Sequence, residues 1–64
     1  MDRLKQLRKI RRMTQVEVCR AIGCPRPLYA LIEQGALPPR EQDLKALASL
    51  YNVSVQYLQK DTKG

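Results

Sequence analysis

Glycine and proline residues divide this chain into short helical segments, and these breaks limit the possible folds more than any other feature. The 64 residues allow one domain. Apolar side chains recur at helical spacing between the breaks, and Gly23 and Gly35 each end such a pattern as a left-handed C-cap would. Only Cys24 and Pro25 separate the segment that ends at Gly23 from the next one. The sequence therefore predicts a compact all-α domain with a tight turn between two short helices.

Five helices are predicted in total. Thr14 and Glu17 form a capping box that starts the second helix. Asn52 can take a left-handed turn after the fourth helix, and Ser54 can cap a short fifth one. The first four helices are predicted over residues 2–12, 15–22, 26–34 and 41–51. The predicted inward positions are Leu4, Leu7, Ile10, Val18, Cys19, Ile22, Tyr29, Ile32, Leu44, Leu47, Ala48, Tyr51, Val55 and Leu58. The domain is expected to span residues 1–59, followed by a flexible C-terminal tail over residues 60–64.

Composition argues against catalysis, metal binding and membrane insertion. The chain has no histidine, so it cannot hold a Ser-His or Cys-His catalytic pair, and no enzyme activity is expected. Cys19 and Cys24 are too few for a zinc site, and they are predicted to be free, buried apolar residues of a cytoplasmic protein. No apolar run approaches the roughly 20 residues that span a bilayer, and no signal peptide is predicted. We therefore expect neither a metal nor a cofactor.

The basic residues are concentrated at the N-terminal end. The chain has 12 Lys and Arg against 6 Asp and Glu, a net charge of +6. Residues 1–26 hold eight of the bases and two of the acids, whereas residues 27–64 hold four of each. A one-sided basic field indicates a polyanionic partner, and nucleic acid is favoured over an anionic membrane. The alternative is a solvated helix face that aids solubility.

The ordered set of residues along the chain resembles the phage Cro and repressor type of helix-turn-helix, also called the xenobiotic-response-element type. The resemblance covers residues 3–59, and the order of Thr-Gln, then Gly, then Glu-x-Gly makes it specific. The matching positions are Leu7-Arg8, Met13-Thr14-Gln15, Val18-Cys19, Gly23-Cys24, Tyr29, Ile32-Glu33-Gln34-Gly35, Pro39, Leu44, Leu47-Ala48, Leu50, Asn52-Val53-Ser54 and Leu58. The resemblance implies a five-helix domain like that of lambda repressor, with the helix-turn-helix formed by helices 2 and 3. It also implies sequence-specific binding to double-stranded DNA, no cofactor and a two-fold dimer.

Transferred position by position, the resemblance assigns roles to single residues. It implies a phosphate contact for Gln15, a place near a second phosphate cluster for Arg40, and a structural ion pair between Arg8 and Glu33. The base-reading positions are Arg26, Pro27, Ala30 and Leu31. Helical geometry supports this set independently, because Pro27, Ala30, Leu31 and Gln34 lie opposite the inward pair of the third helix. Arg26 and Leu28 lie at the edges of that side.

Further basic residues are candidates for phosphate contacts from their places in the predicted helices. Arg11 and Arg12 sit at the bend before the second helix, where they either reach the DNA backbone or form an ordinary solvated turn. Arg20 lies on the outer face of the second helix.

The third helix departs from the family pattern. Family members present Gln, Asn, Ser, Lys or Arg there, whereas this chain presents mainly apolar side chains. Pro25 and Arg40 also stand where a capping Ser or Thr is usual, which removes a cap worth roughly 1 kcal/mol. Three hypotheses follow. Arg26 binds a guanine while Ala30 or Leu31 meets thymine methyl groups, or binding is mostly to phosphates, or the apolar face binds a protein.

The favoured prediction is a prokaryotic or phage transcriptional repressor that occupies an operator in the cytoplasm, associated with the nucleoid. One short reading helix covers few base pairs, so a homodimer on two half-sites is expected. Tyr57 is the favoured dimer contact, whereas Val55 and Leu58 are expected to close the core. The alternative function is a protein-binding adaptor or antirepressor that uses the apolar face of the third helix.

Overall fold

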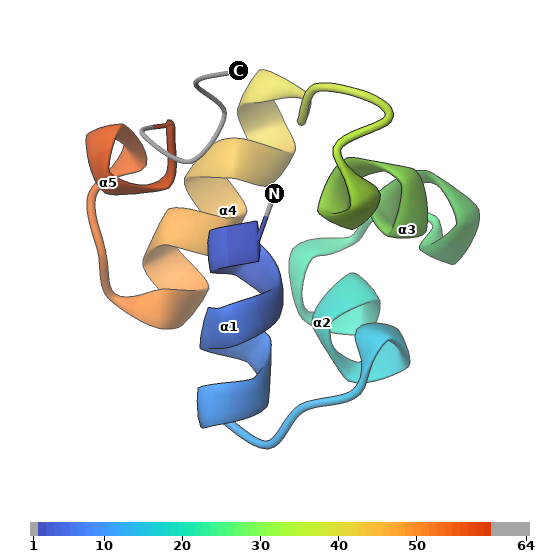
Figure 1. Cartoon of the computed structure of the whole chain (residues 1–64), viewed down its shortest axis with the longest axis horizontal. Coiled ribbons are helices and arrows are strands. Elements are labelled where there is room, and N and C mark those ends of the chain that lie inside the picture. Colours follow the sequence, from blue (N-terminus) through green and yellow to red (C-terminus); the bar gives the residue numbers. More distant parts are fainter. Residues whose placement is uncertain (1, 60–64) are drawn as a thin grey trace.

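The computed structural model describes residues 2–59, and five helices make up its regular secondary structure, with no strand in that range. The helices are α1 (Asp2–Ile10), α2 (Gln15–Ile22), α3 (Arg26–Gln34), α4 (Glu41–Tyr51) and α5 (Val55–Gln59) (Figure 1). This confirms the predicted all-α class and the five helices. The tail predicted over residues 60–64 lies outside the described residues.

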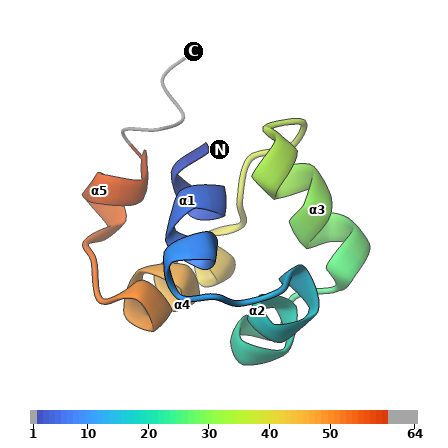
Figure 2. The same ribbon diagram turned by 60° about the horizontal axis from the view of Figure 1, so that its bottom comes forward.

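The helices pack around one core. α4 packs against α2 and α5, while α3 packs against α1 and α2. In both ribbon views α3 and α5 lie on opposite sides of the molecule, with α1 and α4 between them (Figures 1 and 2). α3 therefore stands at an edge of the domain, joined to α2 by a short turn.

The core agrees with the predicted inward positions except at the end of α1. Ile10 was predicted to face inward but is 73% exposed. Each helical residue is rotated by about 100° around the helix axis, so a step of three residues falls about 60° short of a full turn. The two steps from Leu4 to Leu7 and from Leu7 to Ile10 therefore place Ile10 about 120° away from Leu4 around the helix. The buried apolar residues are Leu4, Val18, Cys19, Cys24, Tyr29, Ile32, Leu44, Leu47, Ala48, Tyr51 and Leu58, with Leu7, Ile22 and Val55 half-buried beside them.

α1 is also shorter than predicted. It ends at Ile10 rather than at residue 12, because Arg12 has the left-handed φ of 55°. The Met13 amide donates to the Arg8 carbonyl at 3.0 Å and closes the helix end as a Schellman motif does. No glycine marks this stop, so the sequence carried no local signal for it.

The other helix ends follow the predicted capping residues. The Thr14 hydroxyl accepts from the Glu17 amide at 3.1 Å, and the Glu17 carboxylate accepts from the Thr14 amide at 2.7 Å. Gly23, Gly35 and Asn52 all adopt the left-handed conformation. The Ser54 hydroxyl accepts from the amide of Tyr57. Pro25 and Arg40 provide no side-chain cap, as predicted.

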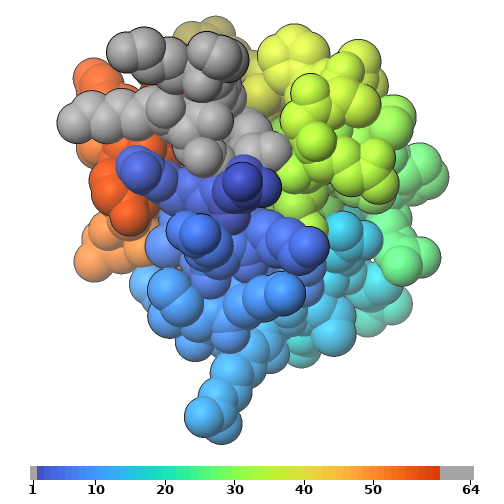
Figure 3. Space-filling view, viewed as in Figure 1, coloured from blue at the N-terminus to red at the C-terminus, as the bar shows by residue number. Residues whose placement is uncertain are grey.

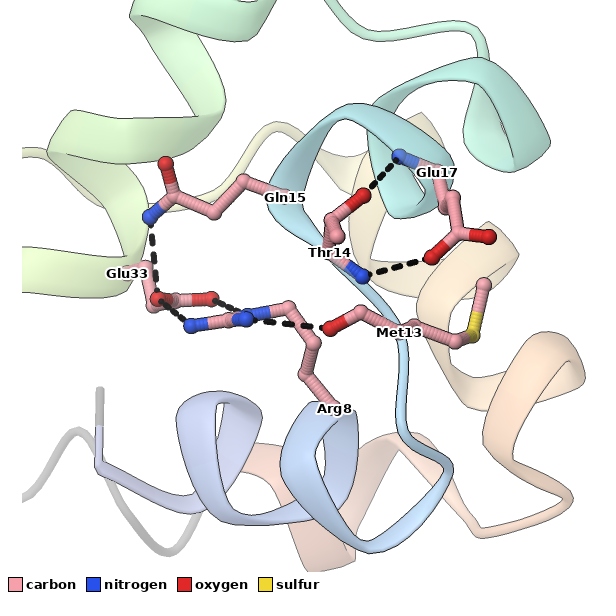
Figure 4. A network of polar contacts seen from close by, with 6 residues as sticks. All are labelled: Arg8, Met13, Thr14, Gln15, Glu17 and Glu33. Carbon is pink, nitrogen blue, oxygen red and sulfur yellow. Dashed lines mark hydrogen bonds and ion pairs between the residues drawn. The ribbon is translucent and has the colours of Figure 1, made fainter.

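A polar network holds α3 against α1 and the start of α2 (Figure 4). Arg8 donates through Nε and Nη2 to the two carboxylate oxygens of Glu33, at 2.9 and 3.0 Å. Its Nη1 donates to the Met13 carbonyl at 3.1 Å. Gln15 Nε2 donates to Glu33 Oε1 at 3.1 Å. One carboxylate thus joins three elements of the fold.

The network is largely shielded from water. The Arg8 and Glu33 side chains are 13% and 4% exposed. Burial alone would raise the pKa of Glu33, but the hydrogen bonds from Arg8 and Gln15 outweigh it and hold that pKa below its ordinary value. Glu33 is therefore an anion at neutral pH, and its charge is matched by Arg8.

Gly23→Ala is expected to lower the free energy of unfolding by about 1–2 kcal/mol, the cost of a left-handed residue with a Cβ atom. A Cβ atom at this position would meet no heavy atom within 4 Å, so steric contact adds nothing to that cost. Gly23→Asn should cost less, because asparagine tolerates the left-handed region better. Urea unfolding of the three proteins measures the difference. Equal losses for alanine and asparagine would show that backbone conformation is not the cause.

Glu33→Gln is expected to lower the free energy of unfolding by about 3 kcal/mol at pH 7, because the shielded Arg8 loses its charged partner. Since folding lowers the pKa of Glu33, its contribution is full above the ordinary glutamate pKa of about 4.3 and is lost as pH falls through the lower folded value. The difference between the parent and the variant should therefore shrink in acid.

The matched control is Glu41→Gln, because Glu41 forms an exposed ion pair with Lys45 at 3.8 Å. This variant should unfold almost like the parent, since exposed pairs contribute little. Urea unfolding at pH 7 and at acid pH compares the three proteins. If Glu33→Gln matches Glu41→Gln at pH 7, the network does not stabilise the fold.

Candidate nucleic-acid interface

The outward side of α3 is available to a partner. Arg26, Pro27 and Leu31 are exposed, and Ala30 is half-buried. The inward side buries Tyr29 and Ile32, which anchor the helix to the core. The four residues predicted to read bases therefore lie together on the side of α3 that the protein leaves uncovered.

The turn between α2 and α3 brings two of the candidate arginines together. Arg20, in the last turn of α2, and Arg26, at the start of α3, line one open hollow of about 440 Å³. Its remaining lining is mostly apolar: Val16, Cys19, Gly23, Cys24 and Pro25. A partner that contacts α3 at its N-terminal end thus meets both arginine residues.

Burial determines the state of the two cysteines at this hollow. Cys19 and Cys24 are free and buried, as predicted. Burial raises the pKa of both thiols, so they are uncharged at neutral pH and pack as small apolar side chains. Their role at the turn is packing of α2 close to α3.

Gln15, for which the resemblance implies a phosphate contact, lies in the first turn of α2. Its amide donates one hydrogen bond to Glu33, which leaves the second N–H of that amide and the carbonyl oxygen for other contacts. A second hollow, of about 380 Å³, joins α1, α2 and α3 at this point. Its lining consists of Asp2, Lys5, Arg8, Gln15, Glu33 and Gln34.

Arg11 and Arg12 lie in the connection between α1 and α2, and both are exposed. Arg11 Nη2 donates to the Tyr51 carbonyl at 3.1 Å. This contact places a positive charge at the C-terminal end of α4, where the helix dipole favours it. Arg11 is therefore directed toward α4 and away from the turn that holds Arg20 and Arg26, whereas Arg12 provides the left-handed residue that ends α1.

Arg40 forms an ion pair that the sequence analysis missed. Its Nε and Nη2 donate to the two carboxylate oxygens of Asp43 at 2.6 and 3.1 Å. The hydrogen bonds to Asp43 raise the pKa of Arg40. Asp43 lies in the first turn of α4, and its side chain is buried. The opposite charges at i and i+3 were the signal that could have found the pair.

Tyr57 combines an exposed side chain with a cation–π contact. The guanidinium carbon of Arg3 lies 4.2 Å from the Tyr57 ring centroid, and Arg3 Nη1 donates to the Tyr57 carbonyl at 2.8 Å. These contacts join α1 to α5. The predicted dimer contact is thus on the side of the molecule opposite α3 (Figure 1).

The basic segment forms a continuous surface. In the space-filling view, the surface of α1 lies at the centre, and α2 and α3 continue it to one side (Figure 3). Residues 1–26, which carry the excess of Lys and Arg, supply α1, α2 and only the first residue of α3 to this surface. Among residues 2–59, no three His, Cys, Asp or Glu side chains gather in a way that could hold a metal ion. None of the described helices has both the length and the apolar character of a membrane span.

The chain matches known proteins over most of its length. A family model described as a helix-turn-helix domain matches residues 2–58. YobD of Bacillus subtilis (strain 168), named as an uncharacterized HTH-type transcriptional regulator, is 38% identical over 57 residues, which are 89% of this chain and 51% of that protein.

This chain therefore spans about half the length of that relative. No solved structure matches this chain. The family match runs from the start of α1 into α5 and includes the α2–turn–α3 unit described above. The chain belongs to the helix-turn-helix domain family.

Proposed function

We propose that this chain binds double-stranded DNA in a sequence-specific manner and acts as a transcriptional repressor, with α3 in the major groove. The observation that carries the proposal is the uncovered side of α3, which begins at Arg26 and lies beside Arg20 at the turn. A helix-turn-helix places its second helix in the groove while the first crosses the backbone. Membership of the family and a relative named as a transcriptional regulator support this proposal.

Base reading is proposed for the exposed side of α3. Arg26 can donate two hydrogen bonds to a guanine, which is the commonest specific contact to that base. Pro27, Ala30 and Leu31 would then face the neighbouring base edges. These contacts would supply the sequence preference, because only base edges carry sequence information directly.

Phosphate contacts are proposed for residues around this helix. They are Gln15, Arg12, Arg20 and Arg40, together with Arg11, whose Nη2 is bound to the Tyr51 carbonyl on the side of α4. Arg40 would reach phosphate through the guanidinium edge that Asp43 does not occupy, since Nη1 is not used in that pair. The Arg8–Glu33 pair would not touch DNA and would instead hold the orientation of α3.

Repression would follow from occupancy of an operator that polymerase also needs. We propose a homodimer, so that two α3 helices read half-sites about one turn apart. Tyr57 is the proposed contact, because it is an exposed aromatic side chain at the α5 side of the domain. The chain would act in the cytoplasm at the nucleoid, as a binding module without catalysis or cofactor, and the resemblance to phage Cro and repressors supports this assignment.

A second candidate function is a protein-binding adaptor or antirepressor. The observation that favours it is the apolar character of the exposed α3 surface, where Leu31 is 40% exposed. Leu37, in the loop that follows α3, is equally exposed. Exposed apolar patches mark protein-binding surfaces in many soluble proteins.

A salt titration on random duplex DNA separates these two functions. If the proposed arginines neutralise about four phosphates, a plot of the logarithm of the association constant against the logarithm of the salt concentration should have a slope of about −3.6. Fluorescence anisotropy of a labelled duplex measures this slope. Absence of binding even at about 50 mM salt would favour the adaptor.

Arginine substitutions test the assignment of the surface. Arg26→Ala is expected to relax the preference at one base by about 1–3 kcal/mol. Arg20→Ala should weaken binding to all sequences alike and reduce the salt slope by about 1. Lys45→Ala is the control, because Lys45 is an exposed base on α4. If Arg26→Ala and Arg20→Ala bind selected and random duplexes with the same affinities as Lys45→Ala and the parent protein, the assigned surface is wrong.

A further inference from the structure

The exposed side of α3 has an unusual chemistry between its two ends. Arg26 begins the helix and Gln34 ends it, and both side chains can form hydrogen bonds with bases. Between them, the outward side chains are Pro27, Ala30 and Leu31, which contain only carbon beyond the backbone. The polar residues within this stretch, Tyr29 and Glu33, are both buried on the inward side.

A carbon surface cannot satisfy most base edges. In the major groove, guanine, cytosine and adenine present hydrogen-bond donors and acceptors, whereas thymine also presents its C5-methyl group. Carbon placed against a donor or acceptor removes water without a replacement partner, which weakens binding. Carbon placed against a methyl group buries apolar surface on both sides and strengthens binding.

We propose that α3 recognises the C5-methyl group of a pyrimidine, in thymine or in 5-methylcytosine, next to the guanine that Arg26 contacts. This inference rests on the proposed function, since it requires α3 to enter the major groove. Arg26 and Ala30 are four residues apart, so they share one side of the helix and reach neighbouring base pairs. Leu31 extends the same carbon surface and is 40% exposed. A cytosine at the contacted position gains affinity when its C5 position is methylated.

The test compares duplexes that differ only in methyl groups. The 64-residue chain first selects binders from a random duplex pool. Each enriched duplex is then copied with thymidine or with deoxyuridine, and thymine–adenine pairs are replaced singly by cytosine–guanine pairs with and without 5-methylcytosine. Deoxyuridine should weaken binding about fourfold for each contacted methyl group, the change in Kd that corresponds to about 0.8 kcal/mol. At a contacted position, 5-methylcytosine should bind more tightly than cytosine.

Two substitutions assign the effect to α3. Leu31→Ala removes carbon from a partly exposed side chain and replaces it with a good helix former. The ratio of the Kd for the deoxyuridine duplex to the Kd for the thymidine duplex should therefore move toward one. Ile10→Ala removes more exposed carbon from the end of α1 and should leave this ratio unchanged. Circular dichroism verifies that both variants are folded.

The outcomes separate this inference from the proposed function. Equal affinity for thymidine and deoxyuridine copies overturns methyl recognition but leaves DNA binding intact. A loss with deoxyuridine and no gain with 5-methylcytosine overturns the equivalence of the two bases. Failure to bind any duplex at low salt overturns both the inference and the proposed function.

Discussion

The hydrogen-bonded ion pair between Arg8 and Glu33 is the interaction on which the arrangement of this domain depends. α3 is a nine-residue helix with no side-chain cap at its start, so local interactions alone hold it weakly. Glu33 accepts hydrogen bonds from two guanidinium nitrogens of Arg8 in α1 and from the side-chain amide of Gln15 in α2. Because these contacts are shielded from water, they are directional, and they set how α3 sits on its neighbours.

This arrangement gives α3 one side that packs against the rest of the protein and one side that is exposed. Tyr29 and Ile32 pack into the core, and Glu33 joins the network, so the inward side is fully used by the protein. On the opposite side, Pro27, Ala30 and Leu31 lie outside the hydrophobic core. A binding surface can therefore be apolar there without being part of the core.

Most of the fold could be predicted because its signals are local. The capping box at Thr14 and the left-handed positions Gly23, Gly35 and Asn52 act within a few residues of the chain, so the bounds of α2, α3 and α4 were correct. The end of α1 was placed too late, because an arginine took the left-handed conformation that a glycine usually marks. Part of the candidate site was predictable for the same reason: helical periodicity alone separates the inward from the outward residues of α3.

The sequence by itself determined the helices, their capping residues, the inward face of α3 and the concentration of positive charge before residue 27. Only the tertiary structure decided which distant partners Arg3 and Arg11 take. Arg11 reaches the Tyr51 carbonyl, and Arg3 covers the Tyr57 ring. The reason is physical: periodicity and capping depend on neighbours along the chain, whereas the partner of a long charged side chain depends on which elements packing brings within its reach.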